Sequence, residues 1–128
     1  MSGQFVADLM TAPVLTVAPD DTAGSVAAAM AREDIKSVVV TSEDCAVDGI
    51  FTATDYMRLA AEGADPSTTA VGACMTTGVV TVRPTDTVAA AAEHMTANDS
   101  SHLPVVDSEA QVTGIVTSTD LTPCLAAD

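Results

Sequence analysis

The feature that most restricts the fold of this chain is an internal repeat. When the sequence is shifted by about 65 residues, its halves align without a gap and about one aligned position in three is identical. Val14-Leu15-Thr16-Val17 then lies over Val79-Val80-Thr81-Val82, and Pro19-Asp20-Asp21-Thr22 lies over Pro84-Thr85-Asp86-Thr87. Because the match extends over nearly the whole chain, the fold must be built from two similar units.

Each repeat shows the same succession of hydrophobic periods. A short β-rich run is followed by a capping residue, Thr22 or Thr87, and by an amphipathic helix of about ten residues with apolar side chains at helical spacing. A buried strand at 37–41 or 102–106 follows, and 47–52 forms a hairpin with the first of these. A closing helix begins near Thr54, carries Tyr56, Leu59 and Ala60, and stops around Gly63.

These elements predict a mixed α+β fold of two β-α-β-β-α repeats. The expected boundaries are residues 5–62 for the first repeat, 63–70 for a plain linker and 71–128 for the second repeat. A single unit of about 55 residues buries too little surface to be comfortably stable. We therefore expect the two repeats to pack through their hairpin sheets with pseudo-two-fold symmetry, leaving two equivalent clefts.

Composition excludes several classes of protein. The 128 residues are 48% hydrophobic and 17% charged, so a packed core is expected. No apolar run approaches the roughly 20 residues that cross a bilayer, and no basic segment precedes an apolar stretch at the N-terminus. The three cysteines, Cys45, Cys74 and Cys124, lack metal-ligand spacing. These observations predict a soluble cytoplasmic protein with reduced thiols and no metal site.

The charge is strongly negative. Eighteen acidic residues against four basic ones give a formal net charge of −14. Such a surface repels nucleic-acid backbones and anionic membranes, so neither is expected as a partner. An acid-rich, lysine-poor composition also resembles that of proteins from salt-loving organisms, in which concentrated salt screens the repulsion between surface carboxylates.

The most specific motif is Gly-Ile-x-Thr-x-Thr-Asp, which occurs at the same point of both repeats. Its members are Gly49 and Gly114, Thr52 and Thr117, Thr54 and Thr119, and Asp55 and Asp120. The glycines allow a bend or a close backbone approach, and the first threonines end a strand. The second threonines are expected at the helix N-cap, with the aspartates in the first turn. Free N–H groups there favour a phosphate, and a carboxylate accepts hydrogen bonds from a ribose diol. Ordinary helix capping is the alternative interpretation.

With Asp8-Leu9-Met10-Thr11, Ser101-His102-Leu103-Pro104-Val105-Val106-Asp107 and the duplicated motif, the chain resembles a tandem pair of CBS domains, also called a Bateman module. The resemblance extends from about Phe5 to Leu125. It implies β-α-β-β-α units, dimers of pairs, adenosine-nucleotide binding in the clefts of the pair, and regulation without catalysis.

Carried over by position, the resemblance implies two sets of nucleotide-binding residues. One cleft would combine Thr11, Thr16 and Ile35 with Ile115, Thr117, Thr119 and Asp120; the mirror cleft would combine Thr76, Thr81 and Ser100 with Ile50, Thr52, Thr54 and Asp55. The two sites should differ, because Ile35 offers an apolar surface to adenine and Ser100 does not. Only Lys36 and His102 could serve as phosphate-side cations, which favours AMP or another lightly charged compound over ATP. ADP, S-adenosylmethionine and NAD remain alternatives.

The sequence therefore predicts a ligand-sensing module with no catalytic residues and no required cofactor. We expect a homodimer in which nucleotide binding changes the tilt of the repeats, and a separate protein that reads this change. A ligand-free structural or protein-interaction module is the alternative. The enzyme hypothesis lacks support, since neither a nucleophile motif nor a phosphate-binding glycine loop is present.

Overall fold

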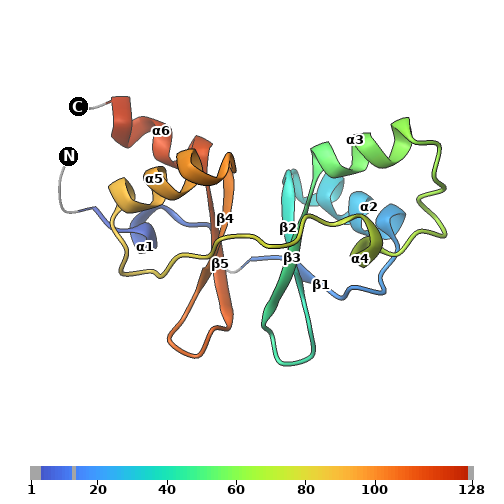
Figure 1. The fold of residues 1–128 in the computed structure, drawn as a ribbon, viewed down its shortest axis with the longest axis horizontal. Helices are drawn as coiled ribbons and strands as arrows, with labels where there is room; N and C mark the ends of the chain where they lie inside the picture. The colour runs from blue at the N-terminus through green and yellow to red at the C-terminus, as the bar shows by residue number, and fades with distance from the viewer. Residues whose placement is uncertain (1–3, 13, 127–128) are drawn as a thin grey trace. The chain divides into compact units, whose positions relative to one another are not determined.

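The two hairpins form where the repeat predicts them (Figure 1). The computed structural model describes residues 4–12 and 14–126, apart from the side chains of residues 123–126, so the thiol of Cys124 lies outside the described part. Strand β2 (Ser37–Thr41) pairs antiparallel with β3 (Val47–Thr52), and β4 (His102–Val106) pairs antiparallel with β5 (Val112–Thr117). The register shifts one residue before the end of both β2 and β4, so the duplication extends to this irregularity.

The amphipathic helices are also confirmed. Helix α2 (Ala23–Glu33) begins at its N-cap Thr22, whose hydroxyl accepts the Ser25 N–H. Helix α5 (Val88–Asn98) begins at Thr87 in the same way. Both end on an aspartate with left-handed backbone, Asp34 and Asp99, a conformation that Asp adopts more readily than most residues.

The closing helices complete two separate hydrophobic cores. Helix α3 (Ala53–Ala61) follows β3 directly, and α6 (Ser118–Ala126) follows β5. In one core Val38, Val40 and Phe51 of the hairpin pack with Val26 and Leu59 of the helices. The other core has the corresponding composition, and its buried members are Val6, Val82, Val88, Ala91, Met95, Leu103, Val105, Val116 and Leu121. The two β-α-β-β-α units of a mixed α/β fold are therefore present as predicted.

The first strand is shorter than the sequence suggests. Strand β1 (Thr16–Val17) pairs parallel with β2, where the Val39 N–H donates to the Leu15 carbonyl. In the second repeat the corresponding run makes only an isolated bridge at Val82. The residue equivalent to Val39 is Pro104, which has no N–H to donate, so the predicted strand at 79–82 loses a ladder hydrogen bond.

The leading segments of the two repeats are exchanged. The chain forms a continuous unit, Leu15–Val79, and a split unit, Met1–Val14 with Val80–Asp128. The short helix α4 (Val71–Cys74) comes from the second repeat but packs in the continuous unit, and α1 (Val6–Leu9) comes from the first repeat but packs in the split unit. Within the continuous unit, α2, α3 and α4 cover the same face of the sheet (Figure 1). The aligned repeats did not reveal this exchange.

Backbone hydrogen bonds hold each exchanged segment. The N–H groups of Val71 and Gly72 donate to the carbonyls of Asp21 and Pro19 at 2.7 and 2.8 Å. In the split unit, Val6 and Ala7 make the equivalent bonds to Asp86 and Pro84 at 2.8 and 3.0 Å. These contacts satisfy backbone donors at the start of α1 and α4, so main-chain hydrogen bonds hold the exchanged segments in place.

The segment before α4 is more than the plain linker that the sequence predicted. The carbonyl of Thr69 accepts the Ala23 N–H at 2.8 Å, and the carbonyl of Pro66 accepts the Gly24 N–H at 3.0 Å. These are first-turn donors of α2 that have no partner within the helix. The segment therefore completes the start of α2.

Among the described helices, none combines the length and the apolar character that spanning a membrane requires.

The two motif glycines lie where backbones meet. A Cβ at Gly49 would stand 2.5 Å from the Thr76 carbonyl oxygen, and one at Gly114 would stand 2.8 Å from that of Thr11. Next to them, Thr76 pairs antiparallel with Ile50, and Thr11 pairs with Ile115. The predicted close approach is confirmed, since a side chain at either glycine would push the exchanged segment off its strand.

We expect Gly49→Ala and Gly114→Ala each to lower the free energy of unfolding by about 2–3 kcal/mol, because the added methyl group meets backbone that cannot move aside. Gly63→Ala is the control, since nothing lies within 4 Å of its Cβ position and only the positive φ of 78° is strained. It should cost about 1 kcal/mol. Urea denaturation measures all three, and equal losses would contradict the steric explanation.

Candidate functional site

Both motif aspartates belong to capping boxes. The Thr52 hydroxyl accepts the Asp55 N–H at 3.1 Å, and the Asp55 carboxylate accepts the Thr52 N–H at 3.0 Å. Thr117 and Asp120 exchange the same two bonds at 3.3 and 2.9 Å. The reciprocal bonds fix each aspartate at the third position of its helix. The capping alternative is thus correct for the local structure of both segments.

The expectation that Thr54 caps the helix is wrong. Thr52 is the N-cap of α3, so Thr54 is the second helical residue and its side chain is exposed. Thr119 likewise follows the first residue of α6 and is exposed, because Thr117 takes the capping role. The strand continues to the last residue that can pair, and the helix starts there without an intervening turn. Within the described part of the chain, the hydroxyls of Thr54 and Thr119 make no hydrogen bond at the helix starts.

The Asp55 carboxylate is buried and accepts further hydrogen bonds. The Thr76 hydroxyl donates to it at 3.1 and 3.3 Å, and Arg58 on the next turn donates at 3.1 Å. The Asp55 side chain is 3% exposed, whereas that of Arg58 is 61% exposed. Thr76 reaches Asp55 because it pairs with Ile50 at the end of β3. The exchanged segment and the start of α3 thus meet at one carboxylate.

The surroundings of Asp120 are more open. Its side chain is half-buried, and Thr117, with which it shares the capping box, pairs with His102 of β4 across the hairpin. The Ser101 carbonyl accepts the Ser118 N–H at 2.9 Å, which fixes the start of α6 against the start of β4. Thr11, the counterpart of Thr76, is exposed and pairs with Ile115 through its backbone. The split unit therefore gathers an aspartate, a histidine and several hydroxyls at one end of its hairpin.

The predicted binding residues fall into the two units as follows. The split unit holds Thr11, Ile115, Thr117, Thr119 and Asp120 from the first predicted set, Thr81 and Ser100 from the mirror set, and His102. The continuous unit holds Ile50, Thr52, Thr54, Asp55 and Thr76 from the mirror set, Thr16 and Ile35 from the first set, and Lys36. The motif residues of each set, with its threonine from the leading segment, are therefore brought together within one unit.

Several of the predicted binding residues already pack in a core or make hydrogen bonds within the protein. Ile35 packs against the core of the continuous unit, and Ile50 and Ile115 are 4% and 6% exposed. Lys36 is exposed, and its carbonyl accepts the first N–H of α3 at 3.0 Å. The Ser100 hydroxyl donates to the His102 carbonyl at 3.1 Å. Within the described ranges no group of histidines, cysteines and acids could hold a metal ion.

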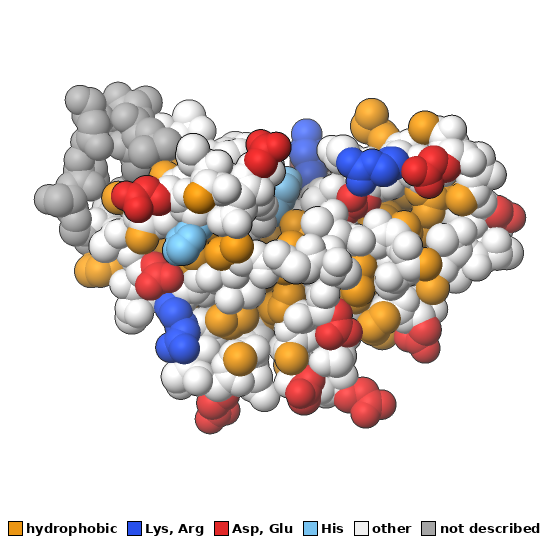
Figure 2. All heavy atoms as spheres, in the orientation of Figure 1, with side chains coloured by type: hydrophobic (Ala, Val, Ile, Leu, Met, Phe, Trp, Pro, Cys, Tyr) orange, Lys and Arg blue, Asp and Glu red, His pale blue; other side chains and the backbone are white. Residues whose placement is uncertain are grey.

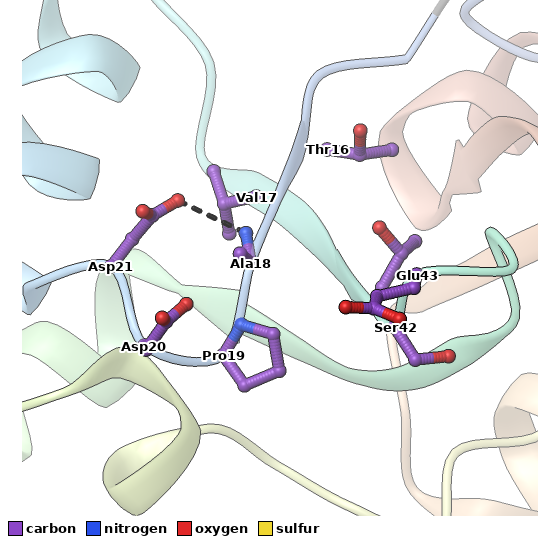
Figure 3. Close-up of a pocket in the computed structure, with 9 residues that line it drawn as sticks. Thr16, Val17, Ala18, Pro19, Asp20, Asp21, Ser42 and Glu43 are labelled. Atoms are coloured by element: carbon purple, nitrogen blue, oxygen red, sulfur yellow. Dashed lines mark hydrogen bonds between the residues drawn. The ribbon is translucent and has the colours of Figure 1, made fainter.

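A hollow of about 590 Å³ lies elsewhere in the continuous unit (Figure 3). Its walls are β1, the turn after it and the tip of the β2–β3 hairpin; the lining residues are Thr16, Val17, Ala18, Pro19, Asp20, Asp21, Thr41, Ser42 and Glu43. Figure 3 shows the Asp21 carboxylate bonded to the Ala18 N–H, a bond of 3.0 Å that closes the turn. The volume suits a small molecule, but the three acids disfavour a phosphate. Of the predicted binding residues, Thr16 lines this hollow.

Acidic side chains dominate the charged groups on the visible face of the molecule, and Lys and Arg are few (Figure 2). In the sequence of the split unit the single lysine or arginine is Arg83. A highly charged anion near Asp120 would therefore meet little compensation.

Comparison with known proteins identifies the family. The CBS domain family matches the chain twice, over residues 6–62 and 71–126. The chain belongs to the CBS domain family. Among solved structures, the CBS domain pair of protein MJ0100 in complex with 5′-methylthioadenosine and S-adenosyl-L-methionine has a TM-score of 0.88 and 25% identity, covering 97% of each chain. The CBS-domain containing protein ATU1752 from Agrobacterium tumefaciens has a TM-score of 0.84 and 32% identity, covering 95% of this chain and 99% of that protein.

Curated relatives match this chain over part of their own length. A homoserine O-acetyltransferase of Methanohalobium evestigatum is 31% identical over 121 residues, which is 94% of this chain and 24% of the relative. An inosine-5′-monophosphate dehydrogenase of Halobacterium salinarum is 33% identical over 104 residues, 20% of its length. This chain thus spans about a quarter or less of the length of these two relatives.

Sequence reasoning missed the role of Arg58. The signal was present, because Arg58 lies three residues after Asp55 on a predicted helix, a spacing that brings opposite charges together. The role of Thr76 at Asp55 had no such signal, since the two residues are 21 positions apart and meet only through the exchanged segment.

The two aspartates should differ in their contribution to stability. Asp55→Ala removes the acceptor for Thr52, Arg58 and Thr76 and should lower the free energy of unfolding by about 3 kcal/mol. Asp120→Ala removes one capping bond and should cost about 1 kcal/mol. Chemical denaturation of the two matched variants checks this difference. Equal losses would show that the bonds from Arg58 and Thr76 contribute nothing.

Cys74 reports on the charge of Asp55. Burial raises the pKa of the Cys74 thiol, and the neighbouring Asp55 carboxylate raises this pKa further. At about pH 8 the thiolate is therefore scarce, and iodoacetamide should modify exposed Cys45 well before Cys74. Asp55→Asn should accelerate the modification of Cys74 by lowering its pKa. Peptide mass mapping follows each site, and an unchanged Cys74 rate in this variant would contradict the electrostatic contribution.

Proposed function

We propose that this CBS pair binds an adenosine compound and regulates a protein partner. The observation that carries the proposal is the Asp120 carboxylate, which the capping box with Thr117 holds in place while its second oxygen accepts no hydrogen bond from the described residues. A carboxylate fixed in this way is suited to accept both hydroxyls of a ribose. The related CBS pair of protein MJ0100 was solved with 5′-methylthioadenosine and S-adenosyl-L-methionine.

The charge of the split unit favours a ligand with little negative charge. Arg83 is its single lysine or arginine, and His102 borders Thr117 at the start of α6. Neutral, cationic or singly phosphorylated adenosine compounds avoid the repulsion that a triphosphate would meet. We therefore propose 5′-methylthioadenosine, S-adenosylmethionine or AMP as the ligand class. The ligand acts by preferring one of two conformations, which a partner protein distinguishes with a coupling of about 1–3 kcal/mol.

The ligand class can be tested by a thermal-shift screen with calorimetry of the compounds that stabilise the protein. A compound at 100 times its dissociation constant should add about 2.7 kcal/mol of stability. We expect 5′-methylthioadenosine, S-adenosylmethionine or AMP to bind at least about tenfold more tightly than ATP, because little positive charge compensates three phosphates. ADP and NAD complete the set, and adenine alone shows how much affinity the ribose contributes.

If no adenosine compound stabilises the protein even at millimolar concentration, the sensor hypothesis is wrong. A ligand-free structural or interaction module would then be the better description. Size-exclusion chromatography with light scattering, run with and without ligand, tests the homodimer that the family resemblance implies.

A further inference from the structure

Both oxygens of the Asp55 carboxylate already accept hydrogen bonds, so neither is open to the hydroxyls of a ribose. Its Oδ2 atom accepts the Thr52 N–H at 3.0 Å and its Oδ1 atom accepts the Arg58 guanidinium at 3.1 Å. The Thr76 hydroxyl donates between both oxygens at 3.1 and 3.3 Å. Arg58 and Thr76 thus occupy the oxygen positions to which a diol would donate. With a side chain only 3% exposed, Asp55 is also shielded from water.

The Asp120 carboxylate lacks both of these donors. In the part of the chain that the structure describes, it accepts one hydrogen bond, from the Thr117 N–H to Oδ2 at 2.9 Å. The sequence position equivalent to Arg58 is Pro123, which has no hydrogen-bond donor in its side chain. Thr11 and its equivalent Thr76 are both exposed, but Thr11 makes its described bonds through its backbone, whereas the Thr76 hydroxyl donates to Asp55. The two carboxylates therefore differ in their hydrogen bonds for two reasons: proline replaces arginine in the second repeat, and the Thr11 hydroxyl does not donate to Asp120 as the Thr76 hydroxyl does to Asp55.

We infer that the two repeats are unequal as nucleoside sites: Asp120 accepts the ribose hydroxyls, whereas Arg58 and Thr76 close Asp55. A ligand at Asp55 would have to displace a charge-assisted bond and a hydroxyl bond from a buried carboxylate. A ligand at Asp120 would not have to break a bond of this kind among the described residues. The inference rests on the proposed function and deepens it, since it assigns the binding to one aspartate and gives Asp55 a structural role.

The duplicated motif does not show which aspartate is closed; the sequence predicted unequal sites on other grounds, from Ile35 and Ser100. Gly-Ile-x-Thr-x-Thr-Asp is present in both repeats, but the donors that occupy Asp55 lie outside it, at positions 58 and 76. The surface position of Arg58, which is 61% exposed, means that its guanidinium remains hydrated when the bond to Asp55 is broken. Removing both closing residues should cost about 2 kcal/mol, the difference expected between Asp55→Ala and Asp120→Ala, so the site can be tested by opening it provided that the variant is shown to be folded.

The first test compares Asp120→Asn with Asp55→Asn by titration calorimetry with 5′-methylthioadenosine. Asparagine keeps an oxygen that accepts the capping N–H, so both variants preserve the helix start. The wild type should bind a single ligand per chain, Asp120→Asn should lose about tenfold or more in affinity, and Asp55→Asn should bind as the wild type does. Adenosine and 2′-deoxyadenosine provide the matched ligand control. The wild type should prefer adenosine, and Asp120→Asn should not distinguish the two.

The second test moves the closing residues. The double variant Arg58→Ala with Thr76→Val should open Asp55 and raise the stoichiometry from one to two. Pro123→Arg supplies an arginine at the sequence position equivalent to Arg58 and should weaken binding by about tenfold. Circular dichroism and thermal melting establish that each variant is folded. A stoichiometry that stays at one in the double variant overturns the role given to Arg58 and Thr76.

The outcomes separate this inference from the function on which it rests. Binding that is lost in Asp55→Asn and kept in Asp120→Asn, or two equal sites in the wild type, overturns the inference and leaves the sensor function standing. Absence of binding by every adenosine compound to the wild type overturns the proposed function, and the inference with it.

Discussion

The fold depends on a backbone contact between the leading segment of each repeat and the second hairpin strand of the other. Thr76 pairs with Ile50 and Thr11 pairs with Ile115, each through two main-chain hydrogen bonds of 2.8–3.1 Å. The contact is possible because the residue before each isoleucine is a glycine, whose missing Cβ leaves room for a carbonyl oxygen. Together with the bonds that the first residues of α1 and α4 donate, it holds each short helix against a core built mainly from the other repeat.

The same contact links fold to chemistry. By fastening Thr76 at the end of β3, it brings a hydroxyl to Asp55, and the Arg58 side chain completes the set. The equivalent bridge at Thr11 leaves Asp120 with the capping bond from Thr117. Two units with matching hairpins, caps and register shifts therefore present carboxylates with different chemical availability. Symmetry of the backbone does not impose symmetry of the sites, because a few side chains decide how each carboxylate is satisfied.

The negative charge of the chain restricts which ligands such a site can bind. With a formal net charge of −14, the protein repels polyanions, and the split unit contributes one arginine. For the ligand class proposed above, affinity would therefore have to come from hydrogen bonds to the ribose and from apolar contact with the base. The homoserine O-acetyltransferase that matches this chain is about four times as long, so the match covers only a part of that relative.

The sequence by itself determined the repeat, the hairpin strands, the amphipathic helices and the motif aspartates, because these depend on periodicity and capping over a few neighbouring residues. It placed the helix start two residues late at Thr54, because it treated the end of a strand and the cap of a helix as separate positions. It also predicted a strand at 79–82, which forms only an isolated bridge. That outcome depends on the pairing of this segment with Pro104, which has no N–H to donate. Only the tertiary structure decided which segment packs on which core and which donors reach each carboxylate. Those outcomes depend on residues far apart in the chain, such as Asp55 and Thr76, whose meeting no local pattern encodes.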